Sequence, residues 1–201
     1  MSTHKIDEQR RKFLVTATTV VGGVGVLAAS LPFATSLLPS AKAEAAAAPV
    51  EVDLSHLQPG QMLTVEWQGK PVWIIYRTKA MIEGLHKHEN ELRDPESRVD
   101  QQPEYAHNEH RSINPDYLVL IGICTHLGCS PKYVPTVHEL GSNWPGGFYC
   151  PCHGSTFDLA GRVFKGVPAP INLAVPPYTF LAEKRILIGT DWNPGQGTRD
   201  G

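Results

Sequence analysis

The chain has 201 residues, which leaves room for one domain of ordinary size and an additional segment, and argues against a multi-domain enzyme. Its 18 basic and 20 acidic side chains nearly balance, so no overall positive field favours nucleic acid as a partner. Hydrophobic residues make up 41% of the chain, and 17 prolines and 18 glycines indicate a loop-rich body in which β structure dominates.

The N-terminal segment combines basic residues with a long uncharged stretch. Lys5 and the run 10–12 are basic, and residues 13–41 carry no charge. An apolar stretch of this length crosses a bilayer as a helix, and basic residues before it place the N-terminus in the cytoplasm. We therefore expect a cytoplasmic N-terminus over 1–12, one transmembrane anchor over 13–38, and a body that is periplasmic in a bacterium.

The residues around the span admit more than one interpretation. Arg10 and Arg11 resemble a twin-arginine signal for folded export, but they also serve as simple positive charge. The Ala-Lys-Ala sequence at 41–43 fits a signal-peptidase site, although the length of the apolar stretch favours an uncleaved anchor. We expect a flexible tether over 39–49, because so short an alanine-rich segment forms only a marginal helix. A passive spacer is the alternative.

The body, residues 50–191, is predicted to be β-rich and is followed by a polar tail over 192–201. Short runs of β-branched and aromatic residues predict its strands. These runs lie at 50–53, 62–67, 72–76, 117–123, 148–150, 179–183 and 185–189, with turns predicted at 68–71 and 159–162.

Between these strands, residues 78–92 have a helical composition with Thr78 as a candidate N-cap. Residues 93–116 are polar and contain three prolines, so we expect a long surface excursion. The histidines of this region lie among Glu and Asn with no cysteine nearby, and we interpret them as surface side chains rather than metal ligands: His86, His88, His107 and His110.

Two short loops, 124–129 and 150–155, contain all four cysteines of the chain. The first loop has a Cys-x-His pattern, Cys124 and His126, and the second a Cys-x-x-His pattern, Cys150 and His153. Together they supply two thiolates and two imidazoles. Such a set holds either a tetrahedral Zn²⁺ or a [2Fe–2S] cluster with two cysteines on one iron and two histidines on the other.

The remaining two cysteines, Cys129 and Cys152, lie one in each loop. A structural zinc site does not need them, and free thiols outside the cytoplasm tend to oxidise. A disulfide between them would clamp the two loops together. Cys150 and Cys152 also form a close pair that suggests thiol-redox catalysis, but such catalysts usually separate the cysteines by two residues.

The sequence Cys-Thr-His-Leu-Gly-Cys, followed by Cys-Pro-Cys-His-Gly-Ser, resembles the paired motif of the Rieske iron–sulfur subunit of bacterial cytochrome bc complexes. The resemblance extends over the whole chain. It implies a mainly β fold, a Rieske-type antiparallel β-sandwich or barrel with a small cluster-binding subdomain, preceded by one transmembrane helix. Matched by position, it implies one [2Fe–2S] cluster held by Cys124, Cys150, His126 and His153, with Ser155 beside it and a disulfide between Cys129 and Cys152.

The function implied by this resemblance is electron transfer in a quinol:cytochrome c oxidoreductase. The cluster takes an electron from quinol, with proton uptake linked to His153 or His126, and passes it to a membrane-anchored c-type cytochrome. Cytochrome b is the other expected partner, within a dimeric complex of the bacterial inner membrane. The alternatives are a Rieske subunit of another periplasmic oxidoreductase and a Cys₂His₂ zinc module. Oxygenase-type ferredoxins generally lack the second cysteine pair and the anchor.

Two positions depart from the family pattern. The segment 166–170 corresponds to the proline-rich loop that covers the cluster, but it contains Val167 within what is often Gly-Pro-Ala-Pro. Ser155 matches the serine that donates to a bridging sulfide, but Phe157 stands where many members have a tyrosine that donates to a cysteine sulfur. Because such donors stabilise the reduced state, we expect a lower midpoint potential than in tyrosine-bearing relatives.

Overall fold

The computed structural model describes residues 7–40, 45 and 47–191. The chain forms two units, residues 1–45 and residues 46–201, which are described separately. The proposed cleavage site at 41–43, part of the expected tether and the tail 192–201 lie outside the described residues.

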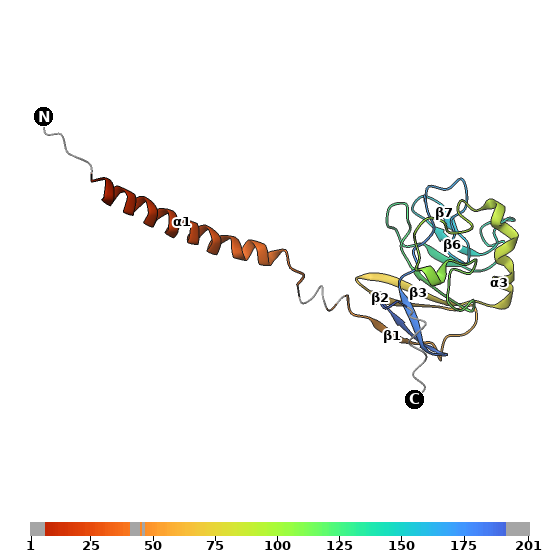
Figure 1. Cartoon of the computed structure of the whole chain (residues 1–201). Coiled ribbons are helices and arrows are strands. Elements are labelled where there is room, and N and C mark those ends of the chain that lie inside the picture. The colour runs from red at the N-terminus through yellow and green to blue at the C-terminus, as the bar shows by residue number, and fades with distance from the viewer. Residues whose placement is uncertain (1–6, 41–44, 46, 192–201) are drawn as a thin grey trace. The chain divides into compact units, whose positions relative to one another are not determined.

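The first unit contains one long helix, α1 (Glu8–Ser36), of 29 residues and roughly 44 Å (Figure 1). Asp7 caps it, because its carboxylate accepts hydrogen bonds from the N–H groups of Gln9 and Arg10 at 3.0 and 3.2 Å. The helix therefore begins before the expected span and includes the basic residues in its first turns. By length and composition it is sufficient to cross a membrane.

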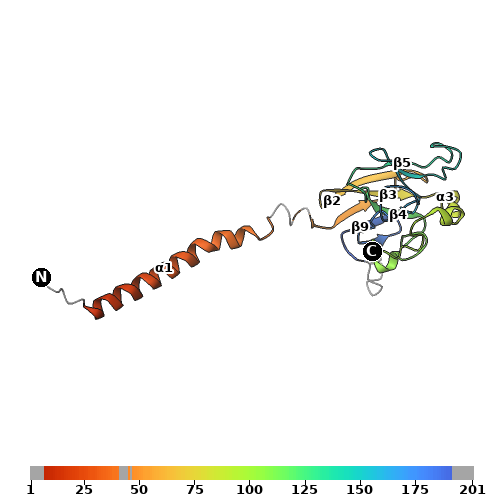
Figure 2. The same cartoon turned by 90° about the horizontal axis from the view of Figure 1, so that it is seen from above.

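Nine short strands form three antiparallel sheets of three strands each in the described part of the second unit (Figures 1 and 2). The strand orders are β1-β9-β8, β2-β3-β4 and β5-β6-β7. The described strands do not close into a barrel, and the predicted antiparallel β-sandwich is confirmed. The strands are β1 (Val50–Asp53), β2 (Met62–Trp67), β3 (Lys70–Tyr76), β4 (Tyr117–Ile121), β5 (Lys132–Val134), β6 (Gly147–Cys150), β7 (Ser155–Phe157), β8 (Tyr178–Ala182) and β9 (Arg185–Ile188).

All seven predicted strands are present, with small differences at their ends. β3 begins at Lys70 because the β2–β3 turn is only two residues long, Gln68 and Gly69, with φ values of 53° and 70°. Two central residues with positive φ match the right-handed twist of a hairpin. β5 and β7 were not predicted, because each has only three residues and neither is a continuous apolar run.

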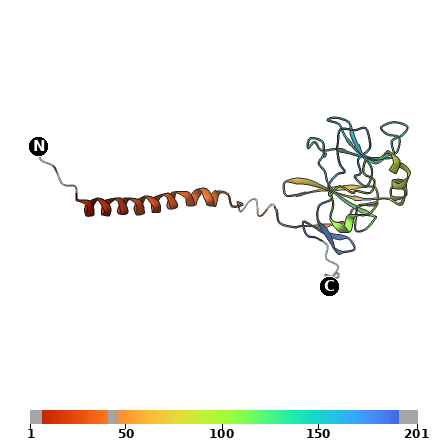
Figure 3. The same ribbon diagram turned by 45° about the horizontal axis from the view of Figure 1, so that its top comes forward.

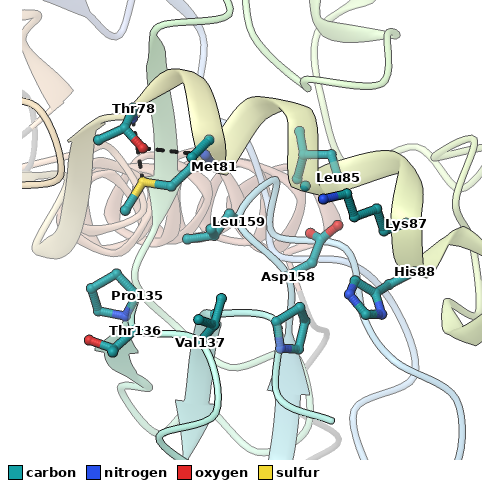
Figure 4. Close-up of a pocket in the computed structure, with 14 residues that line it drawn as sticks. Thr78, Met81, Leu85, Lys87, His88, Pro135, Thr136, Val137, Asp158 and Leu159 are labelled. Atoms are coloured by element: carbon teal, nitrogen blue, oxygen red, sulfur yellow. Dashed lines mark hydrogen bonds between the residues drawn. The ribbon is translucent and has the colours of Figure 1, made fainter.

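The predicted helical segment forms α3 (Lys79–Gly84) and continues as the tighter 3₁₀ helix η1 (Leu85–Glu91). Thr78 caps α3 as predicted, because its Oγ1 accepts a hydrogen bond from the N–H of Met81 at 3.3 Å (Figure 4). Half of the predicted helix is therefore α-helical and half is 3₁₀.

The prediction of a surface excursion over 93–116 is wrong for part of this segment. Arg111 is fully buried, and Gln102 and Ser112 are also buried. The Arg111 guanidinium donates to backbone carbonyl oxygens of Ala160 and Leu173 at 3.1 and 2.8 Å. The polar composition of this segment thus reflects hydrogen bonds in the interior as well as contact with water. The segment also contains the short 3₁₀ helix η2 (Glu104–Ala106).

The main hydrophobic core joins the sheets, while long loops make up much of the remaining unit (Figure 3). Trp73 in β3 stacks on Phe148 in β6, with ring centroids 5.3 Å apart and an interplanar angle of 12°. Gly122 packs against the Trp73 indole so closely that a Cβ at this position would overlap the ring. Cys124 and Cys150 are part of the same core. The two candidate ligand loops therefore begin in its interior.

Candidate functional site

The loops 124–129 and 150–155 have the same turn at their base. The carbonyl of Cys124 accepts a hydrogen bond from the N–H of Gly128 at 3.0 Å, and that of Cys150 from Gly154 at 2.9 Å. Both glycines have positive φ, +82° and +75°, a conformation that a side chain would strain. Each loop therefore holds its cysteine at the buried base and its histidine on the turn.

Cys124 and Cys150 are free thiols, each with 2% of its surface exposed. Burial raises the pKa of the Cys124 thiol above its ordinary value, and the adjacent Cys150 thiol raises it further. The N–H of His126 and the Ser155 hydroxyl act in the opposite direction by hydrogen bonding to the sulfur. Two adjacent thiolates at this depth need a positive partner, which a metal centre supplies.

His126 and His153 bring their rings together at the outer side of the thiols. The ring centroids are 4.7 Å apart with an interplanar angle of 87°, and His153 is exposed whereas His126 is half-buried. In the described part of the chain, Nδ1 of His126 is buried without a hydrogen-bond partner. A buried ring nitrogen left without a partner is costly, and a bond to a metal would satisfy it. The residues present therefore fit an iron–sulfur cluster.

Cys129 and Cys152 form a disulfide that links the two loops. Their sulfur atoms and the sulfur of Cys150 lie within 4.8 Å of one another, so the disulfide packs beside one candidate ligand. Because two of these three sulfurs are bonded to each other, the trio is not itself a metal site. The disulfide instead joins the last residue of the loop 124–129 to the middle of the loop 150–155.

The proline-rich segment 166–170 is tied to the second loop through Ser155, which is fully buried. The Ser155 hydroxyl oxygen accepts a hydrogen bond from the N–H of Ala169 at 3.0 Å, so its proton is directed to another acceptor. Val167, the departure from the family pattern, is half-buried against the core, and its carbonyl accepts from Arg93 at 3.1 Å. The additional residue is therefore accommodated by packing and one hydrogen bond.

Known protein families match both parts of this chain. The family model described as Rieske [2Fe-2S] domain matches residues 49–177. The chain belongs to the Rieske [2Fe–2S] family. A second family model, described as Ubiquitinol-cytochrome C reductase Fe-S subunit TAT signal, matches residues 1–40 of this Rieske protein.

Curated relatives place this Rieske protein among the iron–sulfur subunits of ubiquinol–cytochrome c reductases. It is 55% identical to the subunit of that name from Allochromatium vinosum over 193 residues, covering 95% of this chain and 93% of the relative. It is 42% identical over 188 residues to the subunit from Blastochloris viridis, covering 94% and 97%. A solved structure titled "Hyperthermophilic respiratory Complex III" resembles it with a TM-score of 0.46 and 27% identity, covering 87% and 98%. The cofactor of this family is a [2Fe–2S] cluster, which argues against the zinc and thiol-redox alternatives.

Three buried arginines of the Rieske domain were not predicted from the sequence: Arg77, Arg111 and Arg162. Burial lowers the pKa of Arg77 and of Arg111 to about 10, which means that holding these charges in the interior costs free energy. Backbone carbonyls offset this cost, and Arg162 pairs with the buried Asp158 at 2.7 Å. The sequence contained one indication of these buried charges. Asp158 and Arg162 are opposite charges four positions apart on either side of the predicted turn.

A separate cavity of about 490 Å³ lies between α3 and residues 135–137 (Figure 4). Met81, Leu159 and Val137 line it, together with Asp158 and Lys87. None of its lining residues belongs to the loops 124–129 and 150–155 or to the segment 166–170. The cavity is therefore distinct from the candidate cluster site.

Proposed function

We propose that this chain is the electron-transfer subunit of a quinol:cytochrome c oxidoreductase, with its cluster held by Cys124, Cys150, His126 and His153. The observation that carries the ligand assignment is the pairing of two buried free thiols with two imidazoles, of which His126 has a buried, unpartnered Nδ1. When bound, the cluster accepts one electron at a time, and its two neutral imidazole ligands raise the potential into the range suited to quinol oxidation.

The histidines carry out the proton chemistry in this proposal. With Nδ1 as the ligand atom, Nε2 of His153 accepts a hydrogen bond from the quinol hydroxyl and takes up its proton. His153 is the better placed of the two because it is exposed, whereas His126 is half-buried. Ser155 donates its proton toward the sulfurs and thereby stabilises added negative charge.

The proposed setting is the bacterial inner membrane. In this proposal α1 anchors the chain, with the N-terminus in the cytoplasm and residues 50–191 in the periplasm. The basic residues in the first turns of α1 support this orientation, because basic residues are enriched on the cytoplasmic side of membrane spans. The Cys129–Cys152 disulfide supports this placement, because disulfides persist in oxidising compartments. The partners are cytochrome b and a membrane-anchored c-type cytochrome in a dimeric complex. The tether 39–49 lets the Rieske domain move between them.

A redox titration of the full-length protein at a series of pH values, followed by low-temperature EPR, tests this proposal. We expect a rhombic Rieske signal after reduction with dithionite. The midpoint potential should fall with rising pH in the alkaline range, approaching about 59 mV per unit where one proton accompanies one electron. A potential that stays constant through the alkaline range contradicts proton coupling at the histidines. Absence of the signal together with stoichiometric zinc contradicts the cluster assignment.

A further inference from the structure

A second group of metal-ligating side chains lies on the surface beside η1, outside the cluster loops. His86 and Glu89 belong to η1, and Glu109 belongs to the loop that precedes the buried Arg111. One ligand atom from each of the three side chains lies within 4.8 Å of the other two. The fold thus brings together an imidazole and two carboxylates from segments about twenty residues apart in sequence.

The distances within this group match metal ligands better than direct hydrogen bonds. Nδ1 of His86 lies 3.4 Å from Oε1 of Glu89 and 3.3 Å from Oε2 of Glu109. Hydrogen bonds between nitrogen and oxygen are usually about 2.7–3.2 Å long. Around a tetrahedral Zn²⁺, bonds of about 2.0–2.2 Å separate neighbouring ligand atoms by roughly 3.3–3.5 Å. The two distances from the His86 nitrogen are therefore compatible with shared ligation of one ion, and the three ligand atoms lie within 4.8 Å of one another.

A neighbouring pair on the same helix provides a contrast. His88 and Glu91 have the same i,i+3 spacing in η1 as His86 and Glu89. The His88 Nδ1 and Glu91 Oε1 atoms are 3.1 Å apart, a distance and geometry that make a hydrogen bond. Of the two pairs, only the one containing His86 has a third ligand, Glu109, within this short distance among the described residues.

Further contacts hold both carboxylates in place. The second oxygen of Glu109, Oε1, lies 3.0 Å from Nε2 of His110, a contact of the kind that orients metal ligands from behind. Oε1 of Glu89 lies 3.8 Å from the guanidinium of Arg162. The charge of Arg162 is itself paired with Asp158 at 2.7 Å, which reduces its repulsion of a cation. The two glutamates therefore supply negative charge, and their carboxylates are oriented by these contacts.

We propose that His86, Glu89 and Glu109 form a binding site for a divalent transition-metal ion, with Zn²⁺ as the probe. One imidazole and two carboxylates suit this class of ion, and the two negative charges balance its charge. The side chains are 55%, 44% and 43% exposed, which leaves access for the ion and a position for water as a fourth ligand. Binding links η1 to the loop before Arg111. The site is independent of the cluster and of the proposed electron-transfer function.

Isothermal titration of the full-length, cluster-loaded protein with zinc chloride tests the site. We expect His86→Asn to weaken the tightest Zn²⁺ binding about 10-fold or more relative to the unmodified protein, and Glu109→Gln to have a similar effect. His88→Asn is the matched control and should leave this binding unchanged. The His86 and Glu109 side chains are exposed and that of His88 is half-buried, and an unchanged EPR signal of the cluster verifies each fold.

Zinc X-ray absorption at one equivalent supplies a second readout. We expect nitrogen and oxygen ligands alone, because a sulfur shell near 2.3 Å would place the ion at the cysteines instead. Equal Zn²⁺ affinity in the unmodified protein and His86→Asn overturns the proposal. A sulfur shell, or an equal loss of affinity in His88→Asn, overturns it as well.

Discussion

Phe157 is fully buried in β7, two residues after Ser155, so the two side chains point to the same face of the strand. By the family pattern, we expect a tyrosine at this position to add a donor toward a ligand sulfur. Such a donor stabilises the reduced state more than the oxidised state. If the difference is about 1 kcal/mol, Phe157→Tyr raises the one-electron midpoint potential by about 40 mV. Protein-film voltammetry measures this shift.

Phe180→Tyr, a substitution at a half-buried position in β8, is the control and should leave the potential unchanged. A potential for Phe157→Tyr that is equal to or below that of the unmodified protein would contradict this role for the missing hydroxyl.

At the scale of single residues, the candidate ligands could be identified from sequence because the Cys and His residues lie in short local motifs. The buried arginines could not be identified in this way. Arg77 donates to the carbonyl of Leu159, 82 positions away, and Arg111 to that of Leu173, 62 positions away. A polar residue whose partners are backbone carbonyls of distant segments leaves no local pattern in the sequence. The proximity of His86 to Glu109 was hidden for the same reason.

At the scale of elements, the Cys129–Cys152 disulfide connects the two loops through cysteines that are 23 positions apart in the sequence. Closing a loop of this length lowers the entropy of the unfolded chain and stabilises the fold by about 3 kcal/mol. We expect the double variant Cys129→Ser, Cys152→Ser to lose about this much unfolding free energy and to retain less cluster per protein. Urea unfolding and quantitative EPR measure the two effects.

The exposed neighbour Ser130→Ala serves as the control for the disulfide and should change neither quantity. Full cluster content in the double serine variant would show that the disulfide does not help to hold the loops at the cluster.

Arg111 connects three elements of the Rieske domain. Its guanidinium donates to Gln102 in the excursion, to the turn at Ala160 and to Leu173 at 2.8–3.1 Å. Arg111→Met leaves these acceptors buried without partners, so we expect a loss of about 3 kcal/mol or more in unfolding free energy. Urea unfolding followed by circular dichroism provides the measurement.

Arg98→Met is the matched control for Arg111, because the Arg98 side chain is 78% exposed and pairs with Glu96 at the surface. Its unfolding free energy should stay within about 0.5 kcal/mol of the unmodified protein. Equal effects of the two substitutions would contradict a structural role for the buried guanidinium.

Among the elements, strands of four or more residues were predictable because their apolar runs are bounded by turns. β5 and β7 are defined by pairing with β6, which the sequence does not reveal. The prediction that residues 93–116 lie at the surface was wrong for a related reason. Gln102 and Ser112 are polar but buried, and their sequence does not reveal their buried partners.

At the scale of the whole molecule, the division into two units at residues 45 and 46 lies close to the expected boundary between tether and domain. If the Rieske domain shuttles between redox partners, stiffening the tether should slow turnover without changing the cluster. We expect Ala45→Pro with Ala47→Pro to reduce quinol:cytochrome c reductase activity of the assembled complex and to leave the EPR spectrum unchanged.

Ala45→Ser with Ala47→Ser, which changes the same two positions without introducing proline, is the control and should retain the original turnover. Turnover that is unaffected by the two prolines would identify the tether as a passive spacer.

The Trp73 ring, which contacts both Gly122 and Phe148, has a consequence for the distance between the cluster loops. Gly122 precedes Cys124 by two residues, and Phe148 precedes Cys150 by two residues. The indole therefore contacts both chain segments that lead to the cysteines Cys124 and Cys150. Because an aromatic ring is rigid, we expect it to limit how closely these two segments approach each other. In this way a core side chain constrains the distance between the sulfur atoms of Cys124 and Cys150.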